Sequence, residues 1–160
     1  MSAKITHERL LEVLHYDPET GDFRWIEPGP GRRQTKQAGS LNKMGYITID
    51  VDSQRYFAHN LAWFYVYKEW PKMLDHKKGR SNRIDNLRIA TQSQNLANMD
   101  KPRHNTSGYK GVCWHKKAQK WMAYIQVNGK LKYLGLYTDI EEASKAYLEA
   151  AEIYFGDFAR

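Results

Sequence analysis

Apolar positions in the first half of the chain follow first a helical and then a strand-like period. Leu10, Leu11 and Leu14 form a stripe at helical spacing, and the turn residues Pro18 and Gly21 follow it. The N-terminal elements predicted from such patterns are a helix, a strand, a hairpin and a short aromatic helix, over residues 6–14, 22–26, 46–58 and 60–68. We interpret this portion chiefly as a scaffold, because its aromatic residues have core-like spacing and its charges are mixed.

The end of the chain has a strand-rich pattern followed by one helical stripe. The predicted strands cover residues 109–114, 120–127 and 130–134. Asn128-Gly129 is a strong type I′ turn signal and joins the last two strands. A helix is predicted over residues 140–154, capped by Thr138 and stopped by Gly156. Its apolar stripe consists of Ala143, Tyr147, Ala150 and Tyr154.

A polar segment separates these two halves. Residues 100–106 contain Pro102 and have no apolar periodicity, which is typical of a linker. The predicted organisation is therefore a domain over residues 1–99, a linker over 100–106 and a second domain over 107–160. Strands and helices in both halves predict an α+β fold, with small antiparallel sheets in each domain.

Composition narrows the class of protein. With 160 residues and 41% hydrophobic content, the chain can form one ordinary domain or two small ones. No apolar run approaches the roughly 20 residues that span a bilayer, so we expect no membrane partner. A single cysteine, Cys113, excludes an internal disulfide and favours a cytoplasmic location.

Charge is unevenly distributed. The net charge of +7 fits a polyanionic partner. From Lys101 to Tyr133 there are eight lysines and arginines and no acid, whereas the six acids after residue 100 all lie from Asp139 onward. The predicted C-terminal strands are therefore basic and the helix acidic. Arg32, Arg33 and Lys36 form a second small basic cluster, which either contacts DNA phosphates or keeps a loop soluble.

Residues 74–95 combine an acid, an imidazole and two carboxamides. Asp75 offers a hard oxygen ligand for a divalent cation, and His76 can take a proton from water. Asn86 and Asn95 can orient the imidazole or complete a metal shell. These groups are the ones that hydrolysis of a phosphodiester requires.

The local pattern predicts how those groups converge. Strands are expected over residues 73–76 and 87–90, with a turn-rich loop between them. Thr91 and Gln94 form a capping box, which starts a helix at Gln92 and puts Asn95 in its first turn. A strand, a return strand and a helix would then bring their polar residues to one cation.

At these residues the chain resembles the HNH endonucleases of the phage and intron-associated homing type. The resemblance rests on Asp75-His76, Asn86-Leu87-Arg88 and Thr91-Gln92-Ser93-Gln94-Asn95, preceded by Ala58-His59-Asn60-Leu61-Ala62-Trp63. It implies a ββα-metal nuclease domain with Asp75 and Asn95 as metal ligands, His76 as general base, Asn86 as the group that orients His76, and His59 as a catalytic or supporting residue. The loop between His76 and Asn86 is shorter than is usual in the family.

From Ser107 onward the chain resembles the AP2 (ethylene-response-factor type) DNA-binding domain. The resemblance rests on Ser107-Gly108-Tyr109-Lys110-Gly111-Val112, Trp114, Lys120-Trp121, Ala123-Tyr124-Ile125, Tyr133-Leu134-Gly135, Glu141-Glu142-Ala143, Ala146-Tyr147 and Ala150-Ala151. It implies a three-stranded antiparallel sheet in the DNA major groove, with the helix packed behind. The expected DNA-binding residues are Lys110, Cys113, Trp114, His115, Lys116, Lys117, Tyr124, Gln126, Lys130, Lys132 and Tyr133. Gln126 is a candidate adenine reader, whereas the lysines favour phosphate contacts.

These patterns together predict an endonuclease that depends on Mg²⁺, or alternatively Mn²⁺, and hydrolyses double-stranded DNA to which the C-terminal sheet directs it. A phage or mobile-element product acting in the cytoplasm of a bacterial host is the setting that the resemblance implies. The alternatives are a DNA-binding regulator with an inactive HNH fold and, with less support, an RNA-binding module. Nicking or double-strand cleavage, and a monomer or a homodimer, remain open.

Overall fold

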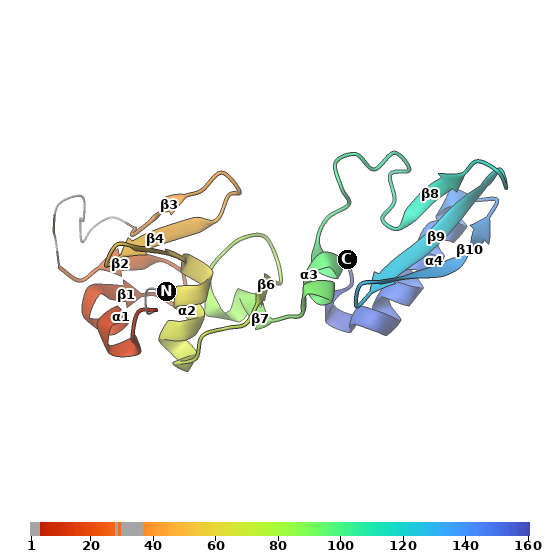
Figure 1. Ribbon diagram of the computed structural model, residues 1–160. Helices are drawn as coiled ribbons and strands as arrows, with labels where there is room; N and C mark the ends of the chain where they lie inside the picture. Colours follow the sequence, from red (N-terminus) through yellow and green to blue (C-terminus); the bar gives the residue numbers. More distant parts are fainter. Residues whose placement is uncertain (1–3, 28, 30–36) are drawn as a thin grey trace. The chain divides into compact units, whose positions relative to one another are not determined.

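A computed structural model of the protein describes residues 4–27, 29 and 37–160. The chain forms two compact units, Met1–Ile89 and Ala90–Arg160, and each is described here by itself (Figure 1). The predicted basic cluster of Arg32, Arg33 and Lys36 lies outside the described residues.

The first unit combines helices with short antiparallel strand pairs. Its helices are α1 (His7–Val13), α2 (Ala58–Tyr67) and the 3-10 helix η1 (Ile84–Asn86). Its strands are β1 (Leu14–Tyr16), β2 (Phe23–Trp25), β3 (Ser40–Leu41), β4 (Ile47–Val51), β5 (Gln54–Phe57), β6 (Leu74–His76) and β7 (Leu87–Ile89). β1 pairs with β2, β3–β4–β5 form a sheet, and β6 pairs with β7, all antiparallel. The small antiparallel sheet predicted before residue 74 is therefore present.

The core of this unit follows from the predicted apolar spacing. Thr6 caps α1 by accepting a hydrogen bond from the Arg9 backbone N–H. Leu10 and Leu14 are fully buried and belong to the same cluster as Ile49 and Leu61. We predicted that Leu11 shares this stripe, but it is 41% exposed. The helix is short, and only a narrow face of it packs against the core.

The second unit is a sheet with one long helix and one short helix. Its helices are α3 (Gln92–Asn98), α4 (Ile140–Phe155) and the 3-10 helix η2 (Gly156–Phe158). Its strands are β8 (Val112–His115), β9 (Lys120–Val127) and β10 (Lys130–Tyr137), in the antiparallel order β10-β9-β8. This is the predicted three-stranded antiparallel sheet with one packed helix, and the fold as a whole is mixed α+β.

The helix α4 covers one face of that sheet. Its buried residues are Ala143, Tyr147, Ala150, Ala151 and Phe155. Phe155 thus replaces the predicted Tyr154, which is 43% exposed. Asp139, not the predicted Thr138, is the N-cap and accepts a hydrogen bond from Glu141 N–H. α4 has 16 residues, and no helix among the described residues is long and apolar enough to cross a membrane.

The boundary between the units differs from the predicted one after residue 99. Ala90 and the helix α3 belong to the second unit, because Ala97 is buried in one cluster with Ile125 and Phe155. Lys110 reinforces this attachment, since its ammonium donates hydrogen bonds to the backbone carbonyls of Ala97, Met99 and Arg160. The predicted hairpin β6–β7 and the predicted helix α3 both form, but they belong to different units.

Candidate functional site

The hairpin β6–β7 fixes the side chain of Asp75. Asp75 lies directly opposite Arg88 in the register, and both Nε and Nη2 of Arg88 are 2.8 Å from Asp75 Oδ2. Asp75 is only 8% exposed, so this ion pair is largely shielded from water. The carboxylate consequently has one defined orientation, set by a residue on the paired strand.

His76 lies on the same strand beside a second imidazole. The rings of His76 and His59 are 5.1 Å apart between centroids and almost perpendicular, at 82°. Tyr46 contacts both rings, and Phe57 stacks on His59 at 5.2 Å. The structure therefore brings His59 of α2 and His76 of β6 together, with Tyr46, which precedes β4, and Phe57 of β5 against them.

Burial in this aromatic cluster changes the acidity of both imidazoles. Burial, together with the nearby His76, lowers the pKa of His59 to about 4. Burial also lowers the pKa of His76, although a hydrogen bond from its ring to the Asn82 side chain and the charge of Asp75 oppose that shift. Both imidazoles are consequently neutral near pH 7, which is the form that can accept a proton.

Asn82 is a site residue that the sequence did not distinguish from an ordinary turn residue. It is 6% exposed, and its backbone carbonyl accepts a hydrogen bond of 2.7 Å from the Tyr16 hydroxyl. Gly21, with φ +81°, lies directly against the same backbone, because a Cβ there would be 2.6 Å from Asn82 C. The turn after β1 therefore holds the residue that contacts His76.

Asn86 contacts the loop and not the imidazole that we predicted it to orient. Its Oδ1 accepts from the Lys78 backbone N–H, and its Nδ2 donates to the carbonyls of Lys78 and Ser81. Its own carbonyl accepts from Lys77 N–H at 2.8 Å. Asn86 thus closes the loop that carries Asn82, and the carboxamide that contacts His76 is that of Asn82.

Arg80 adds a cation to the same region. Its guanidinium lies over the Tyr46 ring, with Cζ 4.8 Å from the centroid, and Nη1 donates to the Met44 carbonyl. Its positive charge also lowers the pKa of His76. The side chain is exposed, so a phosphate could approach it. Arg80 lies between the motif residues His76 and Asn86 and was not among the predicted site residues.

A protein-only metal centre is not present in the described part of the chain. No group of three or more His, Cys, Asp or Glu side chains there could hold a metal ion. Of the two predicted ligands, Asp75 lies in the first unit and Asn95 in α3 of the second. The predicted capping box of Thr91 and Gln94 is confirmed.

The sheet of the second unit has one covered face and one open face. Val112, Ala123 and Ile125 are buried in clusters that contain residues of α4, so their face is the covered one. Directly paired residues share a face and successive residues alternate. The register therefore gives the open face as Cys113, His115, Lys120, Met122, Tyr124, Gln126, Leu131, Tyr133 and Leu136.

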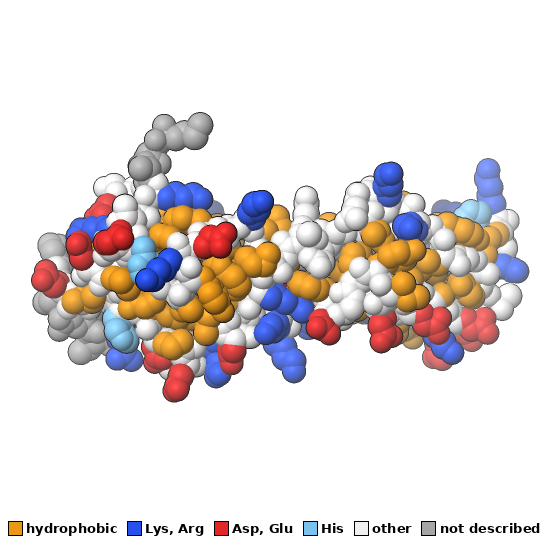
Figure 2. Space-filling model, turned by 90° about the horizontal axis from the view of Figure 1, so that it is seen from below, with side chains coloured by type: hydrophobic (Ala, Val, Ile, Leu, Met, Phe, Trp, Pro, Cys, Tyr) orange, Lys and Arg blue, Asp and Glu red, His pale blue; other side chains and the backbone are white. Residues whose placement is uncertain are grey.

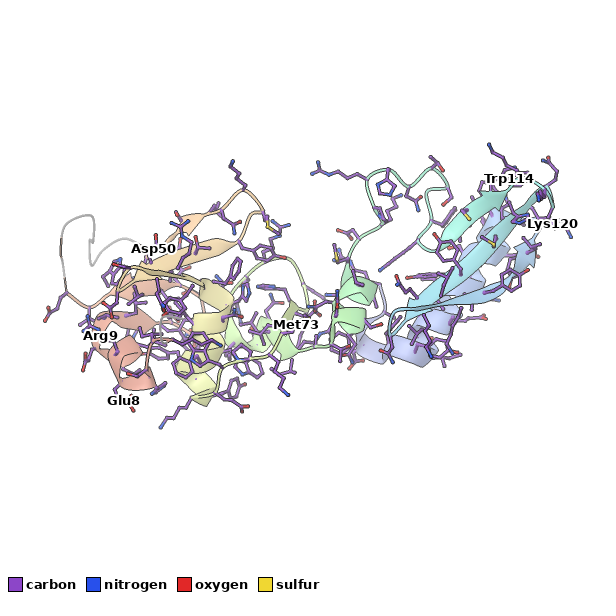
Figure 3. All side chains as sticks on the ribbon, in the orientation of Figure 1. Glu8, Arg9, Asp50, Met73, Trp114 and Lys120 are labelled. Carbon is purple, nitrogen blue, oxygen red and sulfur yellow. The ribbon has the colours of Figure 1, made fainter. Side chains whose placement is uncertain are left out.

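The predicted DNA-binding residues divide between these two faces. His115, Tyr124, Gln126 and Tyr133 are on the open face, as the major-groove prediction requires. Trp114 pairs with Trp121 on the covered face, their rings 5.0 Å apart. Figure 3 shows Trp114 near Lys120, at the end of the sheet where β9 begins.

The structure also shows where the five predicted DNA-binding lysines lie. Lys132 lies on the covered face, with Nζ 3.2 Å from the Tyr154 hydroxyl. Lys110 is half-buried against three carbonyls, and this burial lowers its pKa. Neither ammonium is directed to the open face, and the roles of both lysines in DNA binding stay predictions. Lys130 is exposed beside the β9–β10 turn, and Lys116 and Lys117 are exposed in the β8–β9 turn.

The predicted separation of charge is visible on the surface of the second unit. In Figure 2, acidic side chains gather along one margin of this unit and lysines and arginines along the opposite margin. Glu141 and Glu142 occupy the first turn of α4. The helix is thus the acidic side, and the turns of the sheet are basic.

Comparison with known proteins gives two findings. Residues 107–156 match the family model of the AP2 domain. Protein 3.8 of Escherichia phage T7 is 34% identical over 89 residues, which cover 54% of this chain and 73% of that protein. No solved structure matches the chain.

The AP2 match starts at the residue where we predicted the domain to begin and ends at Gly156, where α4 ends. An AP2 domain is a DNA-binding domain, so the match supports DNA binding by this part of the chain. The identity to the phage protein extends over most of that protein's length. The chain therefore belongs to the family of phage T7 Protein 3.8, and its residues 107–156 form an AP2 domain.

Proposed function

We propose that the protein is a metal-dependent DNA endonuclease of the HNH type. The observation that carries this proposal is the consecutive placement of Asp75 and His76 on β6, where an oriented carboxylate is followed by an imidazole with a lowered pKa. A phosphodiesterase needs both groups, one to bind a cation and one to activate water. The AP2 domain supplies the reason for DNA as the substrate.

His76 is the proposed general base. Its neutral imidazole takes a proton from water, and the water oxygen forms a bond to phosphorus as the bond to the 3′ oxygen breaks. The leaving oxygen then takes a proton from solvent. Asn82 hydrogen-bonds to the imidazole and stabilises the imidazolium formed in this step, because that hydrogen bond favours the charged form.

The donor atoms fit a hard cation such as Mg²⁺, with Mn²⁺ as the alternative. Asp75 offers a carboxylate whose orientation is set by its ion pair with Arg88. His59 Nδ1 is buried and has no hydrogen-bond partner among the described residues, so it is a candidate to contact a hydrated cation. Asn95 stays a predicted ligand. When bound, the cation supplies charge stabilisation at the scissile phosphate.

Because the protein offers few metal ligands, we expect it to bind the cation weakly when DNA is absent. Magnesium sites at phosphates usually combine one or two carboxylates with water and phosphate oxygens. We propose the same here, with duplex DNA completing the coordination. Arg80 would add a phosphate contact near His76, because its charge is close enough to affect that imidazole. The proposed setting is a bacterial host, which agrees with a phage relative.

A plasmid-nicking assay tests the proposal. Supercoiled DNA is incubated with the full chain and Mg²⁺ or Mn²⁺, and His76→Ala is compared with His15→Ala, an exposed histidine on β1. Loss of a general base should slow nicking by about a hundredfold or more, whereas His15→Ala should cut like the parent. A parent that cuts in EDTA, or a His76→Ala variant that cuts normally, would refute the mechanism.

A DNA-binding regulator that retains an inactive HNH fold is the second candidate. The ion pair between Asp75 and Arg88 favours it, because an arginine can replace a cation as the partner of the carboxylate. Such a protein would shift a DNA fragment in a gel but leave plasmid supercoiled at every metal concentration. The same preparation should therefore be used for the shift and for the nicking assay.

A further inference from the structure

The open face of the C-terminal sheet is uncharged over most of its length. Its two direct cross-strand pairs nearest the β9–β10 turn are Gln126 with Leu131 and Tyr124 with Tyr133. Leu131 is 65% exposed and Tyr133 is 64% exposed. Such apolar exposure on a regular sheet marks a contact surface when polar residues surround it.

Lysines lie in or next to the turns at the two ends of the sheet. Lys116 and Lys117 are exposed in the β8–β9 turn, with Lys120 next to them at the start of β9. Lys130 is exposed next to the opposite turn, although its register position opposite Val127 belongs to the covered face. An uncharged middle between basic ends fits a duplex, whose bases lie in the groove between two phosphate backbones. The occupant of this face is therefore duplex DNA.

The middle of the face determines which bases it can read. In the major groove, adenine presents one donor and one acceptor, which a glutamine amide matches with two hydrogen bonds. Thymine presents a methyl group that apolar side chains contact. Gln126 and Leu131, side by side on paired strands, provide these two contacts.

Guanine requires a different set of groups. It presents two acceptors, which arginine or lysine usually binds. Within residues 112–137, all of which the structure describes, the open face has one ammonium, that of Lys120. Lys132 contacts Tyr154 on the covered face instead. The face therefore lacks guanine readers near Gln126.

We propose that this sheet recognises A·T pairs through the major groove, with Gln126 reading adenine and Leu131 contacting the adjacent thymine methyl group. The inference rests on the proposed function, because it requires the sheet to dock on DNA. It adds the base class of the target and names the two residues that determine it.

Four synthetic duplexes of equal length test the base class with the full chain in EDTA. They contain alternating dA·dT, dA·dU, dI·dC or dG·dC pairs. Uracil removes the thymine methyl group, and an I·C pair has a minor groove like A·T but a major groove like G·C. Anisotropy should give the tightest binding to dA·dT, about fourfold weaker binding to dA·dU, and about tenfold weaker binding to both dI·dC and dG·dC.

Variants assign those differences to residues. Gln126→Ala should remove most of the preference for dA·dT over dI·dC, and Leu131→Ala should remove the preference for dA·dT over dA·dU. Ile153→Ala is the matched control, because Ile153 is 80% exposed on α4 and should change neither ratio.

The outcomes separate this inference from the proposed function. Equal binding to all four duplexes, or tighter binding to dG·dC, overturns the A·T inference and leaves DNA binding intact. Binding of dI·dC as tight as dA·dT also overturns it, because the minor groove would then be the one read. A folded parent that binds none of the duplexes refutes the DNA-binding part of the proposed function.

Discussion

The two candidate functional regions differ in how their side chains are held. Around His76, the two imidazoles are partly buried among rings, and the Asp75 carboxylate is buried and held by its ion pair with Arg88. On the open sheet face, Gln126 and Leu131 are exposed and held only by the backbone of paired strands. A group that must change its pKa needs burial, whereas a group that must contact a large partner needs exposure.

Because of this difference, we expect mutations in the two regions to change different measured properties. Changes around His76 should affect folding stability and its pH dependence together with activity. Changes on the open face should affect DNA affinity and leave stability nearly unchanged, because exposed substitutions cost little.

Arg88→Ala should give the largest loss of stability. It would leave the Asp75 carboxylate buried without its partner, which costs about 3 kcal/mol of the free energy of unfolding. Arg55→Ala is the matched control, because its pair with Asp50 is exposed at both side chains and should cost less than about 1 kcal/mol. Urea unfolding of both variants measures the difference. Equal losses would show that the burial of Asp75 has no energetic effect.

Acid should destabilise the first unit through His59. Its pKa is about 4 in the fold against 6.5 for the unfolded chain, so the unfolded chain binds more protons below pH 6.5. Its contribution to stability is therefore present above pH 6.5 and is lost as the pH falls toward 4. Between about pH 7 and about pH 5 this loss should approach 2 kcal/mol.

His59→Gln provides the test of that pH dependence. Urea unfolding of the parent and the variant at both pH values should give a smaller decrease for the variant, because glutamine does not titrate. His15→Gln, an exposed histidine, should retain the decrease of the parent. If His59→Gln loses as much stability in acid as the parent, burial of this imidazole is not the cause.

Lysine variants of the second unit should separate structural from DNA-binding charges. Lys116→Met with Lys117→Met should weaken DNA binding and reduce the slope of log affinity against log salt by about 2. Lys110→Met should leave that slope unchanged, because the Lys110 ammonium is engaged with backbone carbonyls. Anisotropy over a range of salt concentrations measures the slopes. A reduced slope for Lys110→Met would mean that its ammonium leaves those carbonyls for phosphate.

Local signals predicted much of the fold. The strand β9 has the predicted bounds, Asn128 and Gly129 both have positive φ, and the Thr91 capping box is present. These features depend on a few neighbouring residues, whose conformational preferences are strong. The match of residues 107–156 to the AP2 family confirms the predicted AP2 domain.

Features that depend on tertiary packing were not predicted. Lys132 and Tyr133 are adjacent on one strand and cannot share a face, but only the register shows which of them faces α4. β10 continues past Leu134 because a bulge before Gly135 lets it go on pairing with β9. The α3 boundary was misplaced because one alanine, Ala97, buries against residues far along the chain.

The sequence predicted the motif residues of the candidate site but not the contacts that hold them in place. Asp75 and His76 were identified from residue type and spacing and His59 from the family resemblance, and the structure places all three in one unit. The role of Asn82 follows from a buried turn that no local pattern marks. The roles of Asp75, His76, Asn86 and Asn95 in catalysis stay predictions.

The contact of Tyr16 with Asn82 joins residues 66 positions apart. Through this contact and that of Gly21, the hairpin β1–β2 positions the loop that carries Asn82, which hydrogen-bonds to His76. Lengthening the turn between β1 and β2 by a single residue would therefore displace that loop without changing Asp75 or His76 themselves. A change in the first hairpin can in this way alter the surroundings of His76 from a distant part of the chain.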